Sequence, residues 1–193
     1  MNELVITVKQ ARALCMVAPK NDVRAYLNGV HVDMKRNLLT VTDGHMLLRT
    51  KASIQSSKDS DGEYIVPRQT LYDIAKGGNA SNDVALSFDG EVITLTRCNG
   101  VSAIAEPVGG TFPDYDRTIP GEVSGELAQF NHECLATCEK ALIMCSGRKG
   151  LYPNLAHNGN AAAIMSAKGC ESFAIIMPRR DSYPAEWVKW SES

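Results

Sequence analysis

The chain repeats one order of elements three times, and this repetition constrains its fold more than any other feature. Each pass begins with an extended run, continues into an amphipathic helix and ends in further extended runs. The passes start near residues 4, 63 and 125 of the 193-residue chain, a period of about 60 residues. Such repeats bury their apolar faces against one another. The pattern therefore predicts an α+β protein built of strand-helix-strand-strand units.

The first pass predicts a strand, a helix and a hairpin, followed by a polar connector. We expect these elements at 4–7, 8–20, 25–33, 38–42 and 46–52, with the connector at 55–62. The second pass has a strand at 63–66 and a helix at 67–76 that begins with proline and ends at Gly77-Gly78. Its hairpin, 84–88 and 92–97, turns at Asp89-Gly90, and a last strand is expected at 101–107.

The third pass predicts a strand at 125–130 and a helix capped at its start by Asn131. Four residues of this helix are expected to face the core, namely Leu135, Cys138, Leu142 and Cys145. Gly147 or Gly150 should end the helix, and strands should follow at 151–157, 161–167 and 172–177.

This organisation predicts one full domain and one half domain. The units at about 3–57 and 61–110 should pair as a closed domain over 1–110, followed by a linker at 111–122, a half domain at 123–180 and an aromatic tail at 181–193. The third unit then has no partner within its own chain. We expect another subunit to cover its open sheet edge, and hence a homo-oligomer.

Composition excludes several classes of protein. With 44% hydrophobic and 22% charged residues the chain is typical of soluble globular proteins, and it has no apolar run long enough to span a membrane. An acidic residue stands where a signal peptide would carry positive charge, so we expect a cytoplasmic protein. No two of the 6 cysteines have the spacing of a zinc or redox site, and Cys134, Cys138 and Cys145 are expected to pack as small hydrophobic residues of one helix. We expect no cofactor and no metal.

Charge is distributed unevenly, although the net charge is only −2. The helical segments 8–20, 67–77 and 131–149 carry eight basic and three acidic residues, and the remainder of the chain is acidic. This pattern suits a protein that holds phosphates along its helices, but a solvated helix face without a partner would look the same.

Five segments in a fixed order resemble one family. They are DVRAYLNGVHVD (22–33), LLTVTDGH (38–45), YIVPR (64–68), FPDYDRTIP (112–120) and FAIIMPRR (173–180). Together they resemble the bacterial sliding clamp, the β subunit of DNA polymerase III. The likeness runs from about residue 4 to residue 180 and matches the middle domain and a shortened last domain of that clamp.

The resemblance implies a DNA-clamp fold and a processivity factor rather than an enzyme. Clamps of this family encircle duplex DNA without reading its sequence, their helices line the hole, and they receive short peptides from DNA polymerases and clamp loaders. Phosphate contacts are expected from the basic residues in and beside the helices: Lys9, Arg12, Lys20, Arg24, Arg68, Lys76, Lys140, Arg148 and Lys149. A proton relay through Asp43 and His45 lacks a nucleophile at a suitable spacing, so an enzyme has little support.

The resemblance also places a peptide groove on the outer surface. The positions that carry over are Leu27, Thr42, Gly44, His45, Met46, Leu47, Pro113, Arg117, Thr118, Ile175, Ile176, Met177, Pro178 and Arg179. Some of these residues could have a purely structural role instead. Ile175 or Ile176 could be an ordinary core residue, and His45 could be a turn residue that is hydrogen-bonded to the backbone. Pro113 and Pro120 could simply stiffen the linker. Met46 and Thr118 depart from the basic and aliphatic residues expected there.

The chain also departs from the family in length. Clamps of this family have three domains of two units, and two chains close the ring, so three-unit chains would need four copies. A dimer or an open assembly is equally compatible with the sequence, as is a decoy or modulator of a host clamp or its partners, or a binding module for another ligand. A shortened replication gene suggests a phage or mobile element. Trp187 and Trp190 in the tail could cover the groove, dock on a neighbour or pack on the nearest sheet.

Overall fold

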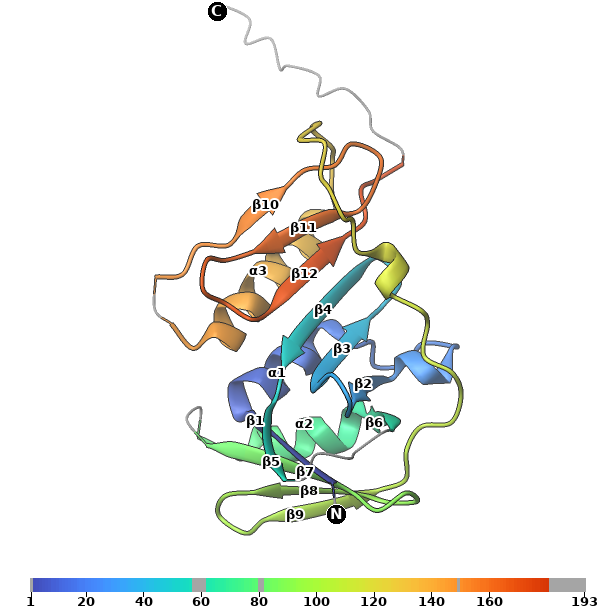
Figure 1. Cartoon of the computed structure of the whole chain (residues 1–193), viewed down its shortest axis with the longest axis vertical. Helices are drawn as coiled ribbons and strands as arrows, with labels where there is room; N and C mark the ends of the chain where they lie inside the picture. Colours follow the sequence, from blue (N-terminus) through green and yellow to red (C-terminus); the bar gives the residue numbers. More distant parts are fainter. Residues whose placement is uncertain (1, 57–61, 80–81, 149, 181–193) are drawn as a thin grey trace, which may run out of the picture.

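The computed structural model describes residues 2–56, 62–79, 82–148 and 150–180 (Figure 1). The predicted tail and Lys149 lie outside the described residues. The strands are β1 (Asn2–Thr7), β2 (Gly29–Asp33), β3 (Leu38–Thr42), β4 (Met46–Lys51), β5 (Ser53–Ser56), β6 (Glu63–Pro67), β7 (Asp83–Phe88), β8 (Ile93–Arg97), β9 (Ser102–Ala105), β10 (Asn154–Ala156), β11 (Ala163–Ser166) and β12 (Phe173–Ile176). The helices are α1 (Val8–Val17), α2 (Arg68–Lys76) and α3 (His132–Ser146), with short 3-10 turns η1 (Ala25–Leu27) and η2 (Asp116–Thr118).

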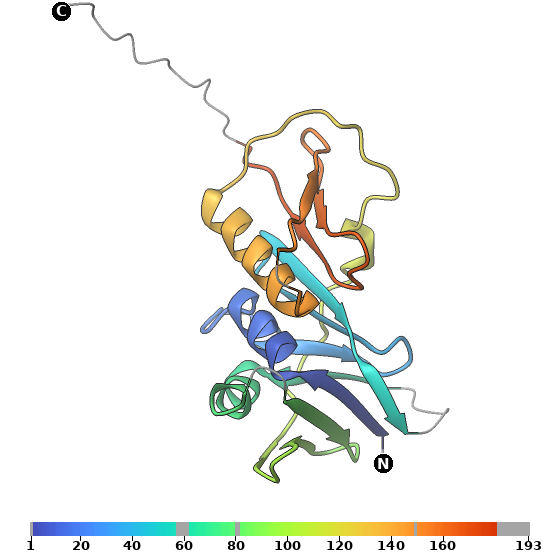
Figure 2. The same ribbon diagram turned by 90° about the vertical axis from the view of Figure 1, so that its left-hand side faces the viewer.

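Two antiparallel sheets form the body of the molecule, and the three helices lie together on one side of them (Figure 2). The five-stranded sheet has the order β5-β1-β7-β8-β9, and the seven-stranded sheet has the order β10-β11-β12-β4-β3-β2-β6. This arrangement agrees with the α+β class and the repeat pattern expected from the sequence. No described helix is long and apolar enough to cross a membrane.

The first two units interlock by exchanging their first strands. Strand β1 of the first unit pairs with β7 in the sheet of the second unit. Strand β6 of the second unit pairs in return with β2 in the sheet of the first. Each unit thus completes the sheet of the other.

The third unit extends the sheet of the first. Strand β12 pairs antiparallel with β4, from Phe173 opposite Arg49 to Ile176 opposite Met46. The expectation that the third unit has no partner within its own chain is therefore wrong for this edge. The strand expected at 125–130 is also wrong, because that segment forms isolated bonds with 157–159 instead of a ladder, including one from Gly125 N to His157 O at 3.0 Å.

Local sequence signals account for the helix ends. Asn131 caps α3 by accepting a bond from Glu133 N, and Gly147 ends that helix with a φ of 64° in the left-handed region. Helix α1 begins with a capping box between Thr7 and Gln10, a signal that our reading of the sequence missed. Strand β5, which pairs with β1, was also missed because its residues resemble a polar connector.

One hydrophobic core joins all three units on the helix side of the sheets. It includes Leu14 of α1, Leu71 of α2 and Leu142 of α3, all fully buried. Burial raises the pKa of the Cys138 thiol to about 12, and it has the same effect on Cys145. These thiols stay protonated near neutral pH, which fits packing rather than reactivity.

Candidate functional site

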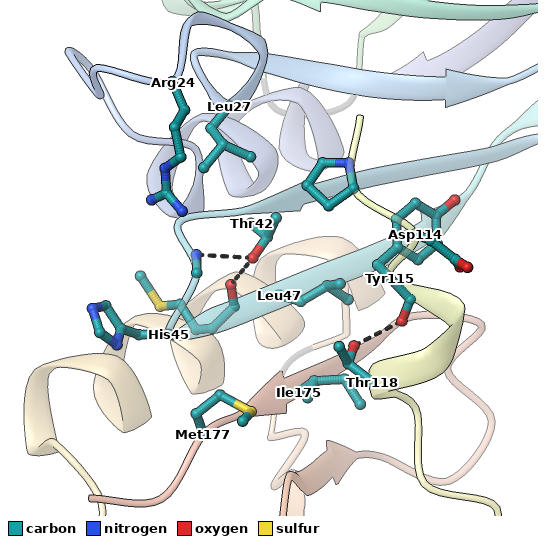
Figure 3. Close-up of a pocket in the computed structure, with 13 residues that line it drawn as sticks. Arg24, Leu27, Thr42, His45, Leu47, Asp114, Tyr115, Thr118, Ile175 and Met177 are labelled. Atoms are coloured by element: carbon teal, nitrogen blue, oxygen red, sulfur yellow. Dashed lines mark hydrogen bonds between the residues drawn. The ribbon is translucent and has the colours of Figure 1, made fainter. Parts of the chain in front are cut away.

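A groove of about 230 Å³ opens on the face of the seven-stranded sheet opposite the helices (Figure 3). Four segments far apart in the sequence meet there: η1, the turn between β3 and β4, the linker before α3, and the end of β12. The lining residues are Arg24, Leu27, Thr42, Gly44, His45, Met46, Leu47, Pro113, Asp114, Tyr115, Thr118, Ile175 and Met177.

Strand alternation explains which residues reach the groove. In β12, Ile175 belongs to the outer cluster under the groove, whereas Ile176 belongs to the core on the helix side. The same alternation in β4 turns Leu47 outward and Leu48 inward. The groove floor is therefore apolar and rests on two adjacent, paired strands.

The turn from Thr42 to Met46 is held by its own side chains. Thr42 Oγ1 donates to Met46 O at 2.8 Å and accepts from Gly44 N at 3.1 Å. Asp43 Oδ1 accepts from the backbone N–H groups of His45 and Met46, both at 2.8 Å. Gly44 has a φ of 95°, which favours glycine at this position. The carboxylate of Asp43 thus stabilises the turn by accepting backbone hydrogen bonds. This arrangement gives no support to a proton relay with His45.

The end of β12 and η1 are tied to this turn. Met177 N donates to His45 O at 2.8 Å, so the third unit forms a groove wall against the first. Arg24 pairs with Asp22 at 2.8 Å and donates to Asp43 O at 3.2 Å. The hydrogen bonds from Arg24 lower the pKa of Asp22 to about 2.

The linker wall is fixed by an ionic bridge. The carboxylate of Asp116 accepts from Arg36 Nη1 at 2.6 Å and also from Arg49 Nη2. These bonds, the one from Arg36 first, hold the pKa of Asp116 below its usual value. Arg49 also lies over the ring of Tyr115 at 4.7 Å. The linker is therefore a fixed part of the site rather than a loose connection.

A buried histidine supports the linker from below. The ring of His31 stacks on Phe112 with centroids 4.8 Å apart. Its Nε2 faces Glu63 Oε2 at 3.3 Å, and its Nδ1 faces the hydroxyl of Tyr115 at 3.4 Å. Burial lowers the pKa of His31 from its usual 6.5, and the hydrogen bond to Glu63 opposes this effect only in part.

We expect the free energy of unfolding to fall as the pH drops below about 6.5, because the unfolded chain then binds a proton that folded His31 accepts less readily. Above that pH His31 is neutral in both the folded and the unfolded chain, so its contribution to the free energy of unfolding is fully present. The slope from this one group can reach at most about 1.4 kcal/mol per pH unit. Urea unfolding at several pH values between 7 and 5 measures this slope. The variant His31→Gln should lose this part of the slope, and an unchanged slope would contradict the assignment.

Comparison with known proteins identifies the family. The family model for the central domain of the DNA polymerase III beta subunit matches residues 3–114, more than half of the chain. The chain belongs to the sliding clamp family. The beta sliding clamp of Vibrio cholerae is 28% identical over 141 residues, which are 72% of this chain and 38% of the relative. The clamp of Bacillus subtilis is 24% identical over 157 residues, which are 80% of this chain and 39% of the relative.

Solved sliding clamps share the fold. The clamp of Borrelia burgdorferi matches with a TM-score of 0.70 at 14% identity, covering 92% of this chain and 64% of that chain. The clamp of Pseudomonas aeruginosa gives a TM-score of 0.67 at 18% identity, with coverages of 92% and 66%. The chain therefore has the DNA-clamp fold, and it spans well under half the length of the relatives that its sequence matches.

The structure brings together most of the residues expected from the sliding clamp motifs. Ten of the expected groove residues line the groove. Of the other four, Ile176 faces the core, Arg117 pairs with Asp114 at 2.7 Å, and Pro178 and Arg179 lie beyond the lining. The expectation missed Asp114 and Tyr115, although both lie within the quoted motif FPDYDRTIP.

Arg24 lies in a different place from the one expected for a DNA contact. It sits at the rim of the groove, on the face opposite the helices, and is paired with Asp22. Arg24 follows the first helix closely in sequence, which is why a DNA contact was expected there. Arg24 therefore lines the groove.

Two of the expected DNA contacts are engaged inside the fold. Arg12 of α1 donates to Ala75 O at 2.9 Å and to Gly78 O at 2.7 Å, at the end of α2. Arg68 of α2 donates through Nε to the carbonyls of Cys15 and Ala18, at 3.1 and 3.0 Å, at the end of α1. Each helix thus has its last carbonyls bound by an arginine of the other, so we reassign these two arginines to the packing of the helices.

Four of the other expected phosphate contacts lie on the surface of the described part of the chain. Lys20, Lys76, Lys140 and Arg148 are exposed. Lys9 is half-buried, and its Nζ lies close to Gly147 at the end of α3. Among the described residues, no group of three or more histidine, cysteine or acidic side chains could hold a metal ion.

Proposed function

We propose that this chain is a sliding-clamp processivity factor that encircles duplex DNA as an oligomeric ring and recruits DNA polymerase and clamp-loader peptides through the groove. The observation that carries the proposal is the groove itself. The described residues of the first unit, the linker and the third unit build an apolar groove on the face opposite the helices. The proposed role is topological and involves no catalysis.

The face of the molecule that carries the helices has basic residues suited to binding DNA phosphates. All three helices lie on one face, and their exposed basic residues can reach phosphates without reading bases (Figure 2). The contacts of Lys20, Lys76 and Lys140 should be weak individually and sensitive to salt. Lys9, Arg148 and Lys149 remain part of this proposal, whereas Arg12, Arg24 and Arg68 do not.

The ring must be built from more copies than in the longer relatives. Because clamps of this family close a ring with twelve units, a chain of three units points to four copies. Mass measurement of the full chain at micromolar concentration tests this number.

Whether the protein encircles DNA can be tested by measuring how much of it remains bound to circular and to linear DNA. If the clamp surrounds the duplex, it should stay on nicked circular DNA and leave once one cut makes the molecule linear, because it slides off the ends. A protein bound by charge alone would be retained equally on both forms. Equal retention would contradict the ring and favour a clamp homologue that acts without encircling DNA.

A charge placed in the groove should weaken peptide binding at least about tenfold, since it would bury an unpaired carboxylate against apolar contacts. Met177 lines the groove and is 42% exposed, so Met177→Glu should preserve the fold. Val123 is 40% exposed and lies outside the groove, which makes Val123→Glu a matched control. The probe is a labelled synthetic peptide with leucine and phenylalanine anchors, followed by fluorescence anisotropy. Equal affinity of the two variants would refute the peptide groove.

A further inference from the structure

An asparagine followed by glycine occurs three times in the chain, at 28–29, 99–100 and 158–159. Such pairs are prone to deamidation, because glycine has no Cβ to hinder the attack of its backbone nitrogen on the asparagine side chain. The reaction also needs a side-chain amide that is free to leave and room for the cyclic imide that forms. The three pairs differ in both of these respects.

The pair at 28–29 is held at the start of β2. Asn28 Oδ1 accepts from Asp22 N at 2.7 Å, and Asn28 Nδ2 donates to Asp22 O at 2.8 Å. Gly29 lies opposite Pro67 in the ladder between β2 and β6. A Cβ added to Gly29 would come within 2.5 Å of the side chain of Ile65. This pair therefore has neither a free amide nor room for the imide.

The pair at 158–159 is held by segments on both sides of it. Asn158 Oδ1 accepts from Ser124 N at 3.0 Å, and Asn158 Nδ2 donates to Ala162 O at 3.2 Å. Gly159 N donates to Glu126 O at 2.8 Å. A Cβ added to Gly159 would lie 2.6 Å from the carboxylate of Glu126. This pair is restrained in the same two ways.

The pair at 99–100 lies in the exposed turn between β8 and β9, at the end of the molecule away from the third unit (Figure 1). Asn99 Oδ1 accepts from Val101 N at 3.3 Å, and Asn99 Nδ2 is not bonded to any described residue. Gly100 N donates to Arg97 O at 2.8 Å, but this bond lies within the same surface turn. A Cβ added to Gly100 would meet no described atom within 4 Å. Here the amide is free to leave and the imide has room.

We propose that Asn99 is a deamidation site of the folded protein, whereas Asn28 and Asn158 are protected by their contacts. Gly100 N bonds to Asn99 Cγ, the bond between Cγ and Nδ2 breaks, and ammonia leaves with the proton that Gly100 N loses. Water then opens the resulting succinimide at either carbonyl, which gives aspartate or isoaspartate.

Either product adds one negative charge to a part of the hairpin, 99–105, that has no charged residue. Isoaspartate also lengthens the backbone of the turn by one carbon atom. The inference goes beyond the proposed function and does not depend on it.

Peptide mass spectrometry of the full chain, aged in mildly alkaline buffer, measures the conversion at each site, because deamidation raises the mass by one dalton. In the folded chain, Asn99 should convert at least about tenfold faster than Asn28 or Asn158, since its reaction requires no separation of distant segments. The same chain unfolded in urea is the control, and all three asparagines should then react at similar rates.

Two variants test the site without digestion of the chain. The folded parent should accumulate an acidic species that ion-exchange chromatography separates. Asn99→Gln should not form this species, because glutamine would have to close a larger ring. Asn160→Gln is the matched control, since Asn160 is also exposed in a turn but is followed by alanine. This variant should form the acidic species at the rate of the parent.

Three results would overturn the inference. Conversion of Asn28 or Asn158 in the folded chain as fast as that of Asn99 would show that their contacts do not protect them. Conversion of all three asparagines in urea, but of none in the folded chain, would show that the bond from Gly100 N to Arg97 O is enough to protect the turn. An acidic species that persists in Asn99→Gln would place the reaction elsewhere in the chain.

Discussion

Replacing Arg12 with alanine is expected to lower the free energy of unfolding by about 3 kcal/mol, within the range for hydrogen bonds to charged groups. The guanidinium of Arg12 binds the carbonyls of Ala75 and Gly78 at the end of α2, and its removal leaves these acceptors without their partner. Urea unfolding followed by circular dichroism measures the change.

Lys9→Ala is the matched control for Arg12→Ala. Lys9 lies on the same helix, one turn earlier, and should change the free energy of unfolding by less than about 0.5 kcal/mol. Equal stability losses in the two variants would contradict the structural role of Arg12. This comparison also guides DNA experiments, because lost DNA binding in an Arg12 or Arg68 variant could result from a disturbed helix pair. Substitution of Lys20, Lys76 and Lys140 avoids that ambiguity.

Leu142→Ala is expected to cost about 3 kcal/mol, typical of a fully buried leucine replaced by alanine. Leu142 lies in α3 and is completely buried in the core that all three units share. Because the core is continuous, the whole chain should still unfold in one transition at a lower urea concentration. Fluorescence and circular dichroism should report the same midpoint.

The control for this substitution is Leu127→Ala. Leu127 is 81% exposed in the segment before α3, so its truncation should leave stability almost unchanged. Two separate transitions in Leu142→Ala would show that the third unit folds independently of the first two. That result would contradict the shared core.

The order of elements and most of the groove could be predicted from the sequence because their signals are local. Asn131 and Gly147 mark the ends of α3 through the preferences of their own side chains and backbones. The motif around Asp43 and Gly44 describes a turn whose hydrogen bonds stay within a few residues. Such features depend little on what packs around them.

The missed features depend on partners that are distant in sequence. Arg12 and Arg68 bind carbonyls that come from the other helix, so the pattern of their own helix does not indicate these contacts. The pairing of β12 with β4 joins residues more than 120 positions apart, and no local pattern indicates it. The position of Arg24 at the groove likewise depends on distant segments, because the fold carries η1 to the outer face of the sheet.

The exchange of first strands between the first two units affects how the protein is made on the ribosome. Strand β1 is translated first, but its partner β7 begins only at Asp83. Strand β2 likewise cannot pair with β6 until the chain has been synthesised as far as Pro67. The amino-terminal half therefore emerges with one edge of β1 and one edge of β2 still open, although β5 and β3 can already pair with their other edges. Premature release should yield a chain that aggregates instead of a smaller folded fragment.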